Sequence, residues 1–174
     1  SDLSLVPTQL ATCLDAGGEV LAAMAKLHTI LIGGSRLDPT LRARAEEAGL
    51  HIVESFGMTE TCGGCVYDGV PLPGVLVRTL EWDGATRIAI AGPVLLTRYL
   101  AQDTPFHDEL GTRWFISGDT GMIDAGGRLK VMGRADDVII SGGLNIPPIR
   151  VDDALKNVSG VKDAWSVGLD EIGR

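Results

Sequence analysis

The chain has 174 residues, which is enough for one ordinary domain or two small ones. Its formal net charge of −8 argues against a nucleic-acid partner, because nucleic-acid sites are basic, but main-chain N–H groups could still bind small anionic ligands. No apolar run approaches the roughly 20 residues of a membrane span, and the first residues do not resemble a signal peptide. The 3 cysteines fit a reducing compartment, so we expect a cytoplasmic protein.

The first third of the chain has the pattern of an α/β unit. Apolar side chains recur at helical spacing in three segments, and two short apolar segments are rich in β-branched residues. Helices are expected at residues 8–14, 19–27 and 38–48, the last with Asp38 as its N-cap, and strands at residues 27–32 and 51–56. Strand, helix and strand at this length predict a parallel βαβ unit.

Two glycine-containing stretches mark the ends of the expected strands. Gly33-Gly34-Ser35 follows the first strand, and Ser55-Phe56-Gly57-Met58-Thr59-Glu60 closes the second, where we expect Gly57 to turn the chain sharply. Ligands of open parallel sheets bind outside the carboxyl ends of the strands, so both stretches should line one pocket. Beyond the strand, Thr59 could donate to a phosphate oxygen and Glu60 could bind Mg²⁺, although a solvated carboxylate is the alternative for Glu60.

After Glu60 the pattern changes to short β segments separated by turn residues, which predicts a small antiparallel sheet or barrel appended to the α/β unit. Strands are expected at residues 75–82, 86–91, 93–96, 113–117, 120–124 and 129–132, with a polar loop at residues 102–111. A charged joint follows at residues 133–137. Beyond it we expect a strand at residues 138–140, a helix at 151–156 and a strand at 161–168.

Two charged residues in the second half are candidates for ligand binding. Asp119 follows an apolar segment and a glycine, where an acid either caps a turn or holds a ligand. A carboxylate can accept hydrogen bonds from two vicinal hydroxyls, which suits a ribose. The guanidinium of Arg134 could bind a ribose hydroxyl or a phosphate, or it could form a structural ion pair with Asp136 or Asp137.

The motifs of several other enzyme classes do not occur in the sequence. There is no glycine-lysine phosphate loop, no dinucleotide-binding glycine motif, no zinc-protease motif and no serine-hydrolase motif. Cys62 and Cys65 have the spacing of a redox or zinc pair, but no further residues with suitable spacing accompany them. We therefore interpret these cysteines as incidental.

Taken in order, the motifs resemble those of the adenylate-forming superfamily, which includes acyl-CoA synthetases, luciferases and the adenylation domains of peptide synthetases. Residues 55–60 are similar to its Tyr-Gly-x-Thr-Glu motif, Ser117-Gly118-Asp119 resembles its Thr-Gly-Asp motif, and residues 133–146 resemble its hinge motif. Residues 63–72 look most like the o-succinylbenzoate-CoA ligases of menaquinone biosynthesis. A ligase for another aryl or fatty acid and a noncatalytic nucleotide-binding module are the alternatives.

This resemblance implies that the chain is a fragment of such an enzyme. Residues 1–134 would be the C-terminal part of the large AMP-binding domain, residues 135–137 the hinge, and residues 138–174 the start of the small α+β C-terminal domain. The implied partners are a small carboxylic acid, ATP with Mg²⁺, and CoA. The protein could also form a homodimer. ATP and the acid would give an acyl-adenylate, and after the small domain rotates, CoA would displace AMP.

The resemblance also implies a role for each matching residue. Phe56 would stack on adenine, Thr59 would contact the α-phosphate, and Asp119 would bind the ribose hydroxyls. The implied catalytic residues are Thr59 and Glu60, with Glu60 also the Mg²⁺ ligand; the implied nucleotide-binding residues are Gly33, Gly34, Ser35, Ser55, Phe56, Gly57, Met58, Asp119 and Arg134; and Asp136 is the implied hinge position.

The resemblance leads to a first prediction, on the activity of the isolated chain. The phosphate loop and the catalytic lysine that it implies have no counterpart in the 174 residues. Since these elements compensate the charge of the reacting phosphates, we predict that this polypeptide alone does not catalyse ATP–pyrophosphate exchange. Exchange with o-succinylbenzoate at an ordinary enzymatic rate, about 1 s⁻¹ or faster, would contradict the prediction.

Overall fold

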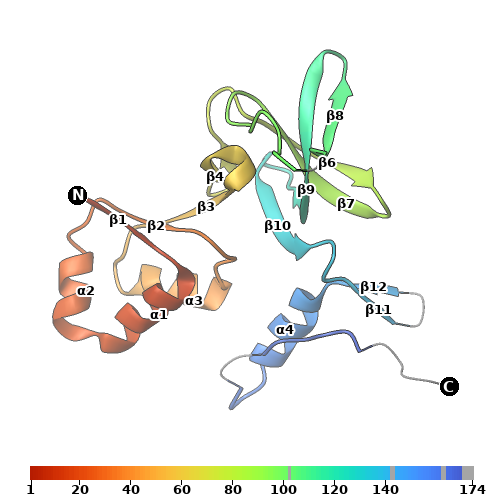
Figure 1. The fold of residues 1–174 in the computed structure, drawn as a ribbon. Helices are drawn as coiled ribbons and strands as arrows, with labels where there is room; N and C mark the ends of the chain where they lie inside the picture. The colour runs from red at the N-terminus through yellow and green to blue at the C-terminus, as the bar shows by residue number, and fades with distance from the viewer. Residues whose placement is uncertain (102, 142–143, 162–163, 170–174) are drawn as a thin grey trace.

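The computed structural model describes residues 1–101, 103–141, 144–161 and 164–169. Within these residues the chain forms three sheets, two of five strands and one of two strands, which follow one another along the sequence (Figure 1). The α/β part comes first, an antiparallel β part follows, and a small α+β segment comes last. This arrangement confirms the expected fold class. None of the helices in the described part of the chain has the length and apolar content that a membrane crossing requires.

The first part is a parallel sheet with its helices on one side. The strands β1 (Asp2–Leu5), β2 (Thr29–Ile32) and β3 (Ile52–Met58) pair in parallel, and the helices are α1 (Pro7–Ala16), α2 (Gly18–Met24) and α3 (Pro39–Glu47). Asp38 caps α3 as predicted, because its carboxylate accepts a 2.8 Å hydrogen bond from the Thr40 N–H. The core between sheet and helices consists of Leu10, Met24, Ile30, Ile32, Leu37, Ala45, Leu50 and Ile52.

Strand β3 is longer than the sequence predicted. Gly57 continues the strand instead of ending it, and β3 pairs antiparallel with β4 (Gly63–Tyr67), which in turn pairs with β5 (Val70–Pro71). The expected sharp turn at Gly57 is therefore wrong. A Cβ atom on Gly57 would overlap with the carbonyl oxygen of Gly63, so the glycine permits a close approach of two strands.

The second sheet is antiparallel throughout. It consists of β6 (Leu76–Trp82), β7 (Ala85–Ala91), β8 (Phe106–Glu109), β9 (Thr112–Ile123) and β10 (Leu129–Arg134), in the order β10-β9-β7-β6 with β8 also paired to β9. β9 is one continuous strand of 12 residues, where the sequence predicted two strands separated near Asp119. Between the pairs Arg87–Thr120 and Ala89–Ile116, residues 117–119 of β9 lie opposite the single residue Ile88. The extra residues form a bulge, so the strand bends without ending.

Two further expectations for this sheet are wrong. Residues 93–96, where a strand was expected, are not in a strand; residues 93–94 form a turn, which the Leu95 N–H closes by donating to the Gly92 carbonyl. Conversely, β8 lies within residues 102–111, which were expected to be a loop. Its side chains are half-buried or exposed, so the segment lacks the apolar alternation by which a strand is recognised.

The last part begins where the chain leaves β10. After a bend at residues 135–138 come β11 (Ile139–Ser141), β12 (Leu144–Ile146) and α4 (Pro148–Lys156). The helix starts three residues earlier than predicted because Pro148 occupies the first helical position, which tolerates proline. Of the expected strand at 161–168, the described residues 161 and 164–168 are not in a strand, and residues 162–163 lie outside the described part. The domain boundary and the hinge at residues 135–137 stay predictions.

Two ion pairs connect α4 to the loop before α3. Arg36 forms two hydrogen bonds with the carboxylate of Asp153, at 3.2 and 3.1 Å. The Lys156 Nζ lies 3.6 Å from a carboxylate oxygen of Asp38. The last part of the chain therefore contacts the first part directly, next to the loop at residues 33–35.

The close approach at Gly57 gives a prediction about stability. We expect Gly57→Ala to lower the free energy of unfolding by about 3 kcal/mol or more, because the methyl group meets main-chain atoms that cannot move aside. The matched control is Gly168→Ala, since a Cβ there meets Ile139 at 3.5 Å, an ordinary contact distance. Urea unfolding of both variants measures the difference, and an unchanged midpoint for Gly57→Ala would contradict this reading of the strand.

Candidate functional site

The loop after β2 and the end of β3 lie against each other, and of these two stretches only Phe56 lines the pocket described below. A Cβ atom on Gly33 would overlap with the Oγ of Ser55, and a Cβ on Gly64 would lie 3.4 Å from the Cβ of Ser55. Gly34 has a φ of +82°, a conformation that side chains rarely adopt. The side chain of Ser55 is thus enclosed by two glycines, and Gly33 allows the loop to approach β3 closely.

Phe56 has surroundings different from those of Ser55, because successive side chains of a strand alternate between faces. It packs against a buried cluster that includes Cys65, Val66 and Leu129. It also lines a pocket of about 450 Å³. The rest of the lining comes from the segment around residues 36–42, from Glu54 of β3 and Val66 of β4, from the turn at residues 68–69, and from β10 with the turn before it. Phe56 therefore presents an aromatic ring to a pocket large enough for a small ligand.

Thr59 and Glu60 lie directly beyond β3, in the short 3₁₀ turn η1 (Thr59–Thr61). The buried Thr61 hydroxyl holds this turn, since it accepts from the Met58 N–H at 3.0 Å and donates to the Gly63 carbonyl at 2.7 Å. The Glu60 carboxylate accepts a 2.5 Å hydrogen bond from the Tyr99 hydroxyl. Burial and this carboxylate raise the pKa of Tyr99 to about 12, so the phenol stays protonated and keeps Glu60 in place.

Asp119 lies in the bulge of β9, directly opposite Arg134 of β10. Its Oδ1 lies 3.7 Å from the Arg134 Nη1, and only 18% of its side chain is exposed. Burial raises the pKa of Asp119 above its ordinary value, the charge of Arg134 opposes that change, and the negative charge of Glu60 adds to it. Glu60, directly beyond β3, thus acts electrostatically on the acid in the bulge of β9.

The guanidinium of Arg134 lies over Gly118 and between two acids. A Cβ atom on Gly118 would be 2.6 Å from the Arg134 Nη2, so the glycine leaves the space that the guanidinium occupies. Besides Asp119, Arg134 approaches Asp136 at 3.6 Å, and Asp136 in turn lies 3.8 Å from Arg87. Arg134 therefore connects the candidate ribose-binding acid to the expected hinge position.

Glu60 fits a Mg²⁺ ion only together with further ligands. Among the described residues there is no group of three or more His, Cys, Asp or Glu side chains that could hold a metal ion. Proteins usually hold Mg²⁺ with one or two carboxylates, while water and substrate phosphates complete the coordination. A single carboxylate at Glu60 matches that pattern for a metal that arrives with a nucleotide.

Comparisons with known proteins give the family. The family model described as AMP-binding enzyme matches residues 1–100, more than half of the chain. The chain belongs to the AMP-binding enzyme family. It is 40% identical to the probable 2-succinylbenzoate–CoA ligase of Mycobacterium tuberculosis (strain CDC 1551 / Oshkosh), over 98% of this chain and 44% of the relative. It is 31% identical to the 2-succinylbenzoate–CoA ligase of Enterococcus faecalis (strain ATCC 700802 / V583), over 95% of this chain and 38% of the relative.

Solved structures of AMP-binding enzymes have the same fold. The o-succinylbenzoate CoA synthetase from Bacillus subtilis in complex with the acyl-adenylate intermediate OSB-AMP matches with a TM-score of 0.79 and 28% identity, over 98% of this chain and 38% of that one. The same enzyme in complex with ATP and magnesium ion matches with a TM-score of 0.77 and 28% identity, over 99% and 40%. The chain thus spans about two fifths of the length of these relatives. The roles of the individual site residues stay predictions.

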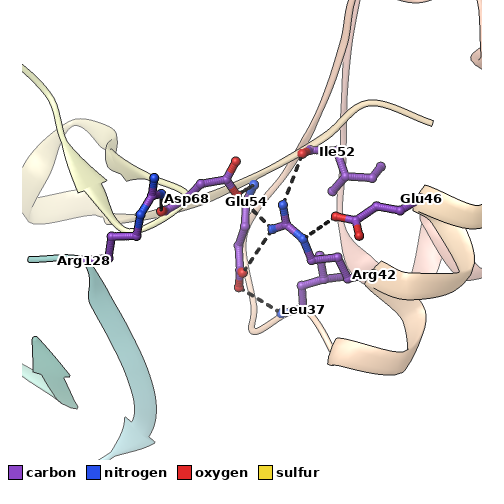
Figure 2. Close-up of polar contacts among 7 residues, drawn as sticks. All are labelled: Leu37, Arg42, Glu46, Ile52, Glu54, Asp68 and Arg128. Carbon is purple, nitrogen blue, oxygen red and sulfur yellow. Dashed lines mark hydrogen bonds and ion pairs between the residues drawn. The ribbon is translucent and has the colours of Figure 1, made fainter. Parts of the chain in front are cut away.

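A polar network beside the pocket was not predicted from the sequence. Figure 2 shows Arg42 of α3 in contact with Asp68, 2.8 Å from Nη1 to Oδ1, while the Nε of Arg42 donates to Glu46 at 2.8 Å. The same Oδ1 of Asp68 accepts from the Glu54 N–H at 3.0 Å. Asp68 and Gly69 form an Asp-Gly pair, which is a strong hairpin-turn signal and could have drawn attention to this turn. Tyr99, the partner of Glu60, gave no such signal because it stands alone in an irregular segment.

The raised pKa of Asp119 gives a prediction about stability and pH. A native pKa above the ordinary value of 3.8 means that ionising Asp119 costs stability, and the cost is complete above the native pKa and vanishes below 3.8. We therefore expect Asp119→Asn to be more stable than the wild type at pH 7. This advantage should shrink as the pH falls through the native pKa. Urea unfolding at several pH values measures it, and a variant less stable at pH 7 would show that the Arg134 pair outweighs burial.

Proposed function

We propose that the chain is part of an o-succinylbenzoate-CoA ligase, which activates the acid with ATP and transfers the acyl group to CoA in menaquinone biosynthesis. The main support is the 40% identity to the mycobacterial relative, which extends over 98% of this chain. The fold shared with a synthetase that binds OSB-AMP supports the same substrate. The co-substrates ATP and CoA are consistent with a cytoplasmic location. The homodimer stays a prediction.

The adenine of ATP would occupy the pocket beside Phe56. The ring of Phe56 lines one side of this pocket and Val131 of β10 also lines it, so a flat aromatic ligand would lie between apolar groups. The loop at residues 33–35 closely approaches β3 next to Phe56. Phe56 in place of a tyrosine keeps the stacking surface and needs no hydrogen-bond partner.

The ribose and the phosphates would occupy the acidic side of the site. In the nucleotide complex Asp119 would accept hydrogen bonds from both ribose hydroxyls, which favours the ionised carboxylate and offsets its burial. Arg134 would turn one of its N–H groups to the nucleotide, and Thr59 would donate to the α-phosphate. Mg²⁺, when bound at Glu60, would neutralise phosphate charge. The protein's contribution is therefore mainly orientation and electrostatic stabilisation.

A panel of acids tests the substrate proposal. With the complete enzyme we expect CoA thioester formation from o-succinylbenzoate with a kcat/KM at least about 100-fold above that for benzoate or a medium-chain fatty acid, because a site built for a second carboxylate leaves charged groups unpaired with those acids. A preference for benzoate or the fatty acid would refute the o-succinylbenzoate assignment. Absence of thioester with every acid would favour the noncatalytic alternative.

Replacing Asp119 tests the nucleotide site. We expect Asp119→Ala to weaken binding of a non-hydrolysable acyl-adenylate analogue to the complete enzyme by about 3 to 6 kcal/mol, the loss of two charge-assisted hydrogen bonds. Isothermal titration calorimetry measures the affinity. Asp108→Ala is the matched control, since Asp108 belongs to the same sheet but is 64% exposed and pairs with Arg113. Equal affinities for the wild type and Asp119→Ala would remove Asp119 from the site.

A further inference from the structure

The pocket beside Phe56 is bounded by two parts of the chain that lie in different sheets. Arg42, Glu54 and Phe56 line it from α3 and β3. Val131 and Met132 line it from β10. In the described part of the chain, β3 and β10 share no hydrogen-bonded ladder, because β3 belongs to the first sheet and β10 to the second. The width of the pocket therefore depends on other contacts between the sheets.

The turn between β4 and β5 supplies such contacts to β10. The Arg128 Nη1 donates a 2.8 Å hydrogen bond to the main-chain carbonyl of Asp68. The Leu129 N–H donates a 2.9 Å hydrogen bond to the carbonyl of Gly69. These two bonds attach the beginning of β10 to the turn.

The same turn is attached to β3 and α3 on its other side (Figure 2). The Asp68 N–H donates to the Glu54 carbonyl at 2.8 Å. The Asp68 Oδ1 accepts from the Glu54 N–H at 3.0 Å and from the Arg42 Nη1 at 2.8 Å. A single residue thus bonds to both walls of the pocket, with its carbonyl on one side and its N–H and carboxylate on the other.

The carboxylate of Asp68 supports an unusual conformation of the turn. Asp68 has a φ of +46° and Gly69 a φ of +79°, in the left-handed region that residues with a side chain rarely adopt. A Cβ on Gly69 would lie 2.8 Å from the carbonyl oxygen of Leu129, so the turn also lies close to β10. Hydrogen bonds from an Asp side chain to nearby main-chain groups stabilise such turns. Without the carboxylate, the turn loses its bonds to the Glu54 N–H and to Arg42 and keeps only the bonds of its main chain.

We propose that Asp68 is a positioning residue for the nucleotide, with Arg42 as its partner. It fixes the spacing between Phe56 on β3 and Val131 on β10, and through that spacing it sets the fit of the base. The inference rests on the proposed function, because it takes the base of ATP as the ligand of this pocket. Asp68 acts on the base alone, so its loss affects nucleotide affinity and leaves the binding of the acid and of CoA unchanged.

Kinetics and binding of Asp68 variants of the complete enzyme test this role. For Asp68→Ala we expect the KM for ATP and the Kd for AMP to rise about tenfold or more, because small displacements in a binding site have large effects. The kcat and the KM values for the acid and CoA should stay within about twofold. Asp68→Asn keeps an oxygen that can accept both hydrogen bonds, so its Kd for AMP should stay within about threefold of the wild type.

The hairpin between β6 and β7 offers a matched control. Asp83 and Gly84 form a turn with φ values of +50° and +74°, much like those of Asp68 and Gly69. The side chain of Asp83 is 86% exposed, and a Cβ on Gly84 would meet nothing within 4 Å. Asp83→Ala therefore carries a similar main-chain cost without touching the pocket. We expect its Kd for AMP to equal that of the wild type.

Several outcomes would overturn the proposal. An unchanged Kd for AMP in Asp68→Ala would do so. A parallel change in kcat and in all KM values would also do so, as would an equal rise in the Kd for AMP in Asp83→Ala. If Asp68→Ala does not fold, Arg42→Gln replaces it, with an expected rise in the Kd of about threefold and the same criteria. Calorimetry with AMP needs no acid, so an enzyme that rejects o-succinylbenzoate would refute the proposed function while the test of Asp68 still gives its answer.

Discussion

The close approach of β3 to β4 is the constraint on which the rest of the site depends. Because Gly57 has no side chain, β3 continues past the parallel sheet and pairs with a second strand beside Gly63. One strand then places three candidate residues at once: Ser55 against the loop at residues 33–35, Phe56 in the pocket, and Glu60 just beyond its end. The glycine of this motif thus has a packing role that is independent of any ligand.

The electrostatics of the site are unfavourable without a ligand. Asp119 is largely buried, the negative charge of Glu60 adds to the cost of ionising it, and Arg134 at 3.7 Å is the cation that offsets part of that cost. A protein selected for stability alone would have little reason to keep an acid here. Ribose hydroxyls and a Mg²⁺ ion would satisfy both carboxylates. The ionisation of Asp119 therefore costs stability in the free protein, as is expected of a carboxylate that is placed to bind a nucleotide.

The sequence predicted those features of the structure that depend on residues close together in the chain. Asp38 was recognised as the N-cap of α3 because capping involves only residues next to it in the chain. The change from the α/β part to the antiparallel part was recognised from the short distances between turn residues. The continuity of β9 through Asp119 was missed, because a bulge is set by pairing with a strand some thirty residues away. The bonds of Asp68 were missed for the same reason, since its partners Arg42 and Arg128 lie 26 and 60 residues distant.

The two ion pairs of α4 bear on the rotation that is expected of the small domain. Arg36 lines the pocket and also binds Asp153, so the proposed nucleotide pocket touches the segment beyond the expected hinge. Both pairs are partly exposed, and such pairs contribute about 0 to 1 kcal/mol each. If residues 135–137 act as the hinge, rotation of the small domain must break them. Interactions of this size favour one orientation without preventing the other, which is what alternation between two half-reactions requires.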